Sequence, residues 1–153
     1  MKKLFIAALM VLFTISSFSQ TDSELDLMQR AFGLEKLQMV LAFVNPSDEY
    51  RETFIDLYEE YEDQRMELGK ERIELLNEYA EKWDGMTNEQ ADEWMKKVLD
   101  LSQKNDKLIR TYFKKIKKNT NAIIATQFFQ VETYILTTIR YSIYENIPFV
   151  DEK

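Results

Sequence analysis

The chain lacks two residue types on which many enzyme and metal sites depend. Its 153 residues include no histidine and no cysteine. Without histidine the commonest general base is missing, and without cysteine there is neither a thiolate nucleophile nor a soft metal ligand. Disulfide bonds are excluded as well. We therefore expect a protein that is not an enzyme and that has no metal site and no cofactor.

Glycine and proline are also scarce, with three and two residues respectively. No glycine-rich phosphate loop is present, and no stretch alternates between apolar and polar residues over the length of a strand. Apolar residues instead recur at every third and fourth position, which is the spacing of amphipathic helices. The sequence therefore predicts an all-α fold.

The N-terminus has the order of segments found in a secretory signal peptide. Two lysines precede an apolar run at 4–15, and the small residues Ser17 and Ser19 suit the positions before a cleavage site. A membrane-spanning helix needs about 20 apolar residues, so this run is too short for an anchor. We expect a signal peptide at 1–19, a single exported domain at 20–153, a periplasmic location and no membrane insertion after cleavage.

Four helices account for the rest of the chain. Their expected ranges are about 22–44, 46–83, 88–118 and 121–145. The connection between the second and third helices is only about three residues long, which forces the two to run antiparallel. The expected architecture is four helices around a long antiparallel helical hairpin.

Capping residues support these helix ends. Asn45 is expected to cap the second helix, and Thr87 with Gln90 forms the pattern of a capping box at the start of the third. Gly85 can adopt the left-handed conformation that ends the second helix. Arg65 places a charge within the apolar stripe of that helix, and we expect it to lie opposite Asn105 and Asp106 of the third helix and to set the register with them.

Charge is distributed unevenly along the expected hairpin. Residues 48–67 contain nine acidic and two basic residues, whereas 104–118 contain seven basic residues and one acidic residue. In the expected hairpin, the numbers of two residues that face each other add to about 170, so the two blocks should lie side by side. Either they pair with each other, or the basic block is open and receives an acidic partner. The formal net charge of −7 disfavours nucleic acid and anionic membranes as partners.

Two groups of apolar residues are candidates for a partner or dimer interface. Phe54, Tyr58 and Tyr61 recur at helical spacing on the second helix, and Ile135 and Ile139 belong to a fourth helix that is apolar nearly all round. Such a stripe is common in helix cores, but a helix without a polar face must be covered on several sides. We expect a second copy or another protein to cover it, and we predict a homodimer.

Several motifs resemble the Spy/CpxP group of periplasmic stress proteins. Residues 86–90 are similar to the LTxxQ motif of that group, and 44–48 resemble a second, degenerate copy. Two further segments resemble one branch of this group, described as sensors of extracytoplasmic-function sigma factors. One is the helix that contains Phe54, Tyr58, Glu60, Tyr61 and Arg65, and the other is the pair Gln130 and Glu132 in the last helix.

The resemblance implies an elongated, cradle-shaped helical dimer. Members similar to Spy act as ATP-independent chaperones, and members similar to CpxP restrain an envelope-stress sensor. The expectation is therefore a non-enzymatic periplasmic protein that binds unfolded or envelope proteins. The alternatives are a regulatory module that docks on a membrane-embedded stress regulator and a structural interaction subunit.

Overall fold

A computed structural model describes the backbone of residues 22–150 and the side chains of 33–150. The predicted signal peptide at 1–19 lies outside the described residues. The chain divides into two compact units at the boundary between Glu35 and Lys36, and the second unit contains most of the described residues. The all-α prediction is confirmed, because the described residues form four helices and no strand.

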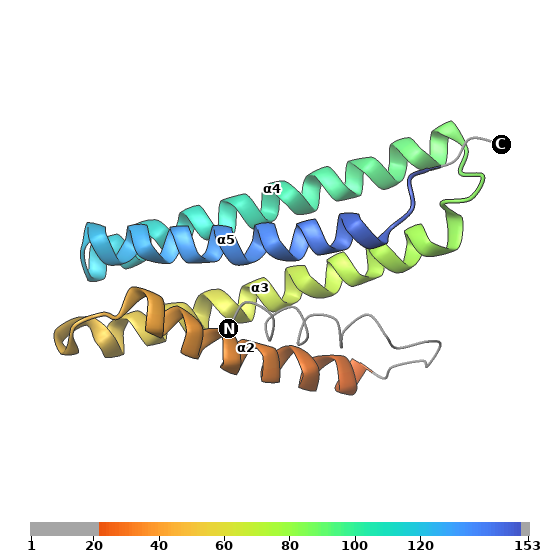
Figure 1. Cartoon of the computed structure of the whole chain (residues 1–153). Coiled ribbons are helices and arrows are strands. Elements are labelled where there is room, and N and C mark those ends of the chain that lie inside the picture. The colour runs from red at the N-terminus through yellow and green to blue at the C-terminus, as the bar shows by residue number, and fades with distance from the viewer. Residues whose placement is uncertain (1–21, 151–153) are drawn as a thin grey trace. The chain divides into compact units, whose positions relative to one another are not determined.

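The helix boundaries follow the sequence pattern closely. Helix α2 spans Asp22–Val44, α3 spans Asp48–Lys82, α4 spans Asn88–Asn119 and α5 spans Ala122–Asn146 (Figure 1). In the described residues no helix is both long enough and apolar enough to cross a membrane.

The predicted caps of α4 are confirmed. The Thr87 hydroxyl accepts a hydrogen bond from the Gln90 backbone N–H at 3.2 Å, and the Gln90 side chain accepts one from the Thr87 N–H at 2.9 Å. Gly85, with a φ of 89°, reverses the chain just after α3. Asn121 caps α5 in a similar way, since its side chain accepts a hydrogen bond from the Ile124 N–H at 2.9 Å.

The prediction that Asn45 caps the start of the next helix is wrong. Asn45 has a φ of 41°, and its N–H donates to the Leu41 carbonyl at 2.9 Å, so it ends α2 in the left-handed conformation. Asparagine tolerates this conformation better than most residues do. The N-cap of α3 is instead Ser47, which makes no side-chain capping bond.

Helices α3 and α4 pack side by side and run in opposite directions (Figure 1). Lys97 bonds to Glu78 at 2.8 Å, and Lys104 bonds to Glu71 at 2.9 Å. Facing residue numbers in these pairs add to 175 rather than the predicted 170. Long side chains lean toward the N-terminus of their own helix, so contacting residues in an antiparallel pair have higher numbers than residues whose backbones are level.

Helix α5 packs against α4 and runs parallel to α3. Tyr58 and Tyr61 of α3 each form a T-shaped contact with the Phe128 ring, and the Tyr79 hydroxyl donates to the Pro148 carbonyl at 2.7 Å. A single apolar core joins these helices to the end of α2. Its buried members are Val40, Leu41, Val44, Phe54, Tyr58, Tyr61, Ile109, Tyr112, Ile116, Ile124, Ala125, Phe128, Val131 and Ile135.

Candidate functional site

The structure places the predicted interface residues inside the bundle. Phe54, Tyr58 and Tyr61 are buried in the core, Ile135 is nearly as buried, and Ile139 is half-buried against the same core. The prediction that they form a partner or dimer interface is therefore wrong for the folded chain. The end of α2 and the inner face of α5 cover the aromatic stripe within one chain, and the sequence reasoning underestimated this cover.

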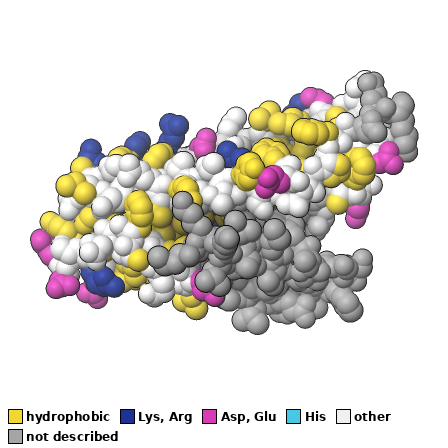
Figure 2. Space-filling view, viewed as in Figure 1, with side chains coloured by type: hydrophobic (Ala, Val, Ile, Leu, Met, Phe, Trp, Pro, Cys, Tyr) yellow, Lys and Arg dark blue, Asp and Glu magenta, His cyan; other side chains and the backbone are white. Residues whose placement is uncertain are grey.

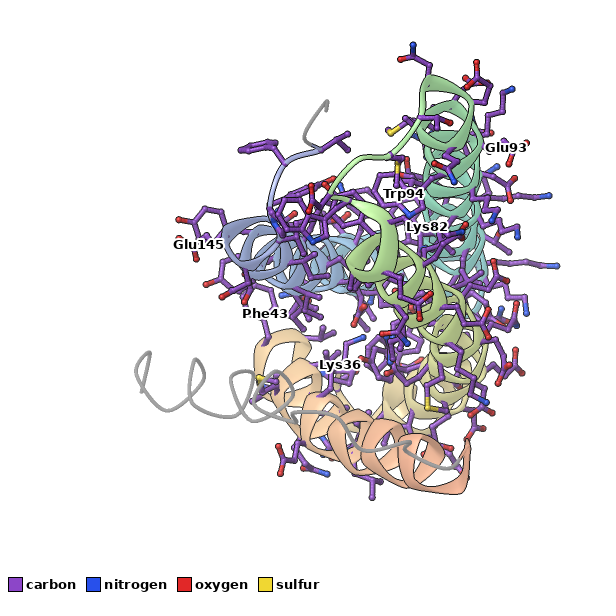
Figure 3. All side chains as sticks on the ribbon, turned by 90° about the vertical axis from the view of Figure 1, so that its right-hand side faces the viewer. Lys36, Phe43, Lys82, Glu93, Trp94 and Glu145 are labelled. Atoms are coloured by element: carbon purple, nitrogen blue, oxygen red, sulfur yellow. The ribbon has the colours of Figure 1, made fainter. Side chains whose placement is uncertain are left out.

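A cluster of charged side chains lies buried between the end of α2, α3 and α5. The Lys36 ammonium donates to one carboxylate oxygen of Glu62 and one of Glu132, each at 2.8 Å. The side chains of Lys36 and Glu132 are 1% and 0% exposed. Figure 3 shows Lys36 projecting from α2 toward α3 and α5.

The remaining carboxylate oxygens of the cluster also have donors. The Tyr58 and Tyr61 hydroxyls donate to the two different oxygens of Glu132, each at 2.8 Å. Two guanidinium nitrogens of Arg65 contact the second Glu62 oxygen, Nη2 at 2.6 Å and Nε at 2.8 Å. Both oxygens of both buried carboxylates therefore accept hydrogen bonds from the chain itself.

The predicted partner of Arg65 is wrong. Arg65 pairs with Glu62 on its own helix, and the amide of Asn105, the polar residue expected opposite, donates to the Leu101 carbonyl at 2.9 Å. A guanidinium can reach a carboxylate three residues away along one helix. Glu62 is in turn held by Lys36, so the polar contact in the core links α2 to α3 rather than α3 to α4.

Burial and neighbouring charges shift the pKa values of this cluster. Burial alone would raise the pKa of Glu62, but the positive charges of Lys36 and Arg65 outweigh it, and the pKa lies below the ordinary value. Burial, together with the charge of Glu132, holds the pKa values of Tyr58 and Tyr61 well above the ordinary tyrosine value. Glu62 is therefore stabilised as the carboxylate and both tyrosines as neutral phenols.

This arrangement suits a structural role better than a chemical one. Two cations and two carboxylates balance, and no carboxylate oxygen is left to act on a substrate. Buried ion pairs contribute little net stability compared with apolar packing, but removing one member leaves an uncompensated charge. The described residues also contain no group of three or more acidic, histidine or cysteine side chains that could hold a metal ion.

Sequence reasoning missed Lys36 and Glu62 and gave Glu132 no role of its own. The available signal was Glu132, because it is the only charged residue between Ala122 and Ile139 on a long apolar helix. A single carboxylate at such a position requires a buried partner or an exposed edge. Nothing comparable marked Lys36, since the sequence at 22–44 contains charged residues at several positions.

The outer face of α5 is exposed and uncharged. Tyr134 is 70% exposed and Ile123 is 71% exposed. The exposed residues of α5 before Arg140 are Ala122, Ile123, Thr126, Phe129, Gln130, Thr133, Tyr134, Thr137 and Thr138. This face spans about 24 Å at 1.5 Å per residue. We call these nine residues the α5 outer face.

More exposed apolar side chains continue beyond this face. Tyr141, Tyr144 and Phe149 follow along α5 and the segment after it, and Met95 and Leu99 are exposed on α4. Figure 2 shows hydrophobic side chains spread over this side of the molecule, with a larger group toward the end where α4 begins and α5 ends. The described residues of one chain therefore leave this side of α5 exposed, and the expectation that a second copy or another protein covers it stays a prediction.

The two charge blocks are only partly paired. Lys115 of the basic block pairs with Glu60 of the acidic block at 3.1 Å. Lys104 of the basic block pairs with Glu71, which follows the acidic block on α3, at 2.9 Å. The rest of the basic block is exposed and borders a shallow depression that contains a single acid, Asp106. Some members of the basic block are therefore paired and the others are exposed, and whether an acidic partner binds the exposed members stays a prediction.

Comparisons with known proteins do not identify the chain. No family model matches it, and neither curated proteins nor solved structures gave a match.

Proposed function

We propose that this protein is an exported, non-enzymatic helical module that binds other proteins through the α5 outer face. The observation that carries the proposal is the absence of charge from nine exposed positions, in a chain where 31% of residues are charged. Protein interfaces are depleted in charged residues at their centre and enriched in aromatic ones. Tyr134 and Phe129 supply aromatic side chains, and the threonines and glutamine supply adaptable hydrogen-bonding groups.

Other ligand classes fit this face poorly. Nucleic acids and anionic membranes are bound mainly by clustered cations, and the face has none. A small-molecule site would be a concave, largely enclosed pocket, whereas these side chains stand out from a single helix. An extended or helical segment of another protein is the ligand that such a surface accommodates.

The resemblance to Spy/CpxP proteins suggests where and on what the module acts. In this proposal the signal peptide directs it to the periplasm, where it binds unfolded or envelope proteins as an ATP-independent chaperone or stress adaptor. The second candidate is a regulatory module with one dedicated partner on a membrane-embedded stress regulator. The formal net charge of −7 favours that candidate, because an acidic surface repels many acidic clients.

An aggregation assay with several unrelated unfolding proteins tests the proposal and separates the two candidates. Broad suppression at near-stoichiometric amounts supports the chaperone, whereas no suppression together with one tight partner captured from envelope extract supports the regulator. Tyr134→Glu should reduce either activity at least about tenfold, the effect expected for an interface aromatic. The control is Asn77→Glu, which adds the same charge at an exposed position of α3.

Loss of binding in both variants, or in neither, would contradict the assignment to the α5 outer face.

The proposed location has its own test. The exported protein should begin at Gln20, and an intact mass that retains residues 1–19 would contradict export with cleavage.

A further inference from the structure

Two rows of opposite charge lie on α3 and α4. The acidic row on α3 consists of Asp56, Glu59, Asp63 and Glu67. The basic row on α4 consists of Lys107, Arg110, Lys114 and Lys118. Successive members are three or four residues apart, so each row follows one face of its helix. All eight residues are exposed.

Both rows face away from the core on the same side of the α3–α4 pair. On α3 the core side is marked by Tyr58 and Tyr61, and on α4 by Tyr112 and Ile116. The rows occupy the opposite side of each helix. Figure 3 shows α5 on one side of the pair, and long side chains of α3 and α4 projecting on the other, where Glu93 is labelled. Figure 2 shows Lys and Arg gathered along the C-terminal half of α4.

The rows do not neutralise each other within the chain. The ion pairs that cross from α4 to α3 lie at the seam between the helices and use Lys97, Lys104 and Lys115. Among the described residues the basic row forms no ion pair, and the acidic row forms one, from Glu67 to Lys70 on its own helix. Like charges three or four residues apart destabilise a helix slightly. Each row therefore slightly destabilises its own helix, and binding to a surface of opposite charge would offset this repulsion.

The spacing of the two rows matches. Ion pairs across the seam join residues whose numbers add to 175. Rotation about a two-fold axis parallel to the helices does not change the position of a residue along that axis, and it places α3 of one copy over α4 of the other. Residues that meet between the two copies should therefore also have numbers that add to about 175. The numbers add to 174 for Glu67 with Lys107 and for Asp56 with Lys118, and to 173 for the two pairs between them.

We propose that this outward face of α3 and α4 is a self-association surface, on which two copies dock with the acidic row of each over the basic row of the other. The symmetry uses both rows of both copies at once, as an isologous interface requires. Copies of a chain with a net charge of −7 repel each other in general, but the four acids and the four bases of the two rows balance one another. A nucleic acid or an anionic membrane would be repelled by the acidic row beside the basic one.

The interaction is expected to be weak and sensitive to salt. Exposed ion pairs contribute little each and are screened when the Debye length falls to a few ångströms. The proposal does not rest on the proposed function, because the α5 outer face takes no part in it.

Sedimentation of the purified protein tests the proposal. At about 0.02 M NaCl the protein should form a dimer, and the dissociation constant should rise about tenfold or more at about 0.5 M NaCl. Lys107→Glu with Lys114→Glu should be monomeric, and so should Glu59→Lys with Glu67→Lys. An equimolar mixture of these two variants should form a heterodimer, because each carries the charge that the other needs on both helices.

The control is Arg51→Glu with Arg140→Glu, which changes charge by the same amount at two exposed positions away from the outward face of α3 and α4 and should leave the dimer unchanged. A circular dichroism spectrum confirms that each variant is folded. A wild-type protein that is monomeric at low salt would overturn the proposal. So would a dimer that persists in the single-row variants, or a mixture of the two that stays monomeric.

Discussion

Replacing Lys36 with methionine removes one cation from the buried cluster while keeping the length and the apolar part of the side chain. Glu62 keeps Arg65, but Glu132 loses its only cation and retains two tyrosine hydroxyls. The cluster changes from two cations and two carboxylates to one cation and two carboxylates. Removal of one partner from a buried ion pair costs about 3–5 kcal/mol. We expect a loss of that size in the free energy of unfolding.

Urea denaturation followed by circular dichroism measures this loss. The double variant Lys36→Met with Glu132→Gln restores charge balance, so it should be more stable than the two single losses predict, by at least about 1 kcal/mol. Lys104→Met is the control, since Lys104 forms an exposed ion pair with Glu71 and should cost no more than about 1 kcal/mol. A cost for Lys36→Met as small as that of the control would refute the buried cluster.

Three further outcomes are expected. Thr87→Ala should cost about 1 kcal/mol in urea denaturation through the lost helix cap, and no change would contradict the capping box. Phe128→Ala should cost about 3–5 kcal/mol because the ring is fully buried, whereas Phe149→Ala, at 93% exposed, should cost almost nothing, and equal costs would contradict this placement. Burial raises the pKa values of Tyr58 and Tyr61 in the folded chain, so the stability they contribute is complete below about pH 10 and is lost as the pH rises further. In a spectrophotometric titration these two tyrosines should ionise at higher pH than exposed tyrosines, and ionisation of all eight tyrosines of the folded protein near pH 10 would contradict their burial.

Local signals in the sequence were sufficient for the helices and most of their ends. The apolar spacing gave the ranges within a few residues, and the Thr87 capping box and Gly85 have the predicted geometry. Asn45 was misplaced because asparagine suits both the start of one helix and the end of another. Only three residues separate α2 from α3, so spacing could not distinguish the two roles.

Which apolar stripe is buried could not be derived from the periodicity of single helices. Phe54, Tyr58 and Tyr61 have the spacing of a core stripe and of an interface alike, and the choice depends on where α2 and α5 lie. Lys36 is 96 residues from Glu132 along the chain. A contact between residues so distant is decided by tertiary packing, and a lysine on a mixed helix carries no local sign of burial.

Photocrosslinking from the α5 outer face in living cells tests most directly whether this face binds other proteins. A photoreactive phenylalanine analogue at Tyr134 occupies an exposed position without adding charge, and the same analogue at Glu74 on α3 is the control. We predict crosslinks to other proteins from position 134. From position 74, which lies on the outward face of α3, we predict no crosslinks other than those to a second copy of the chain. Crosslinks from position 74 alone, or none from position 134, would contradict the claim that α5 binds protein partners.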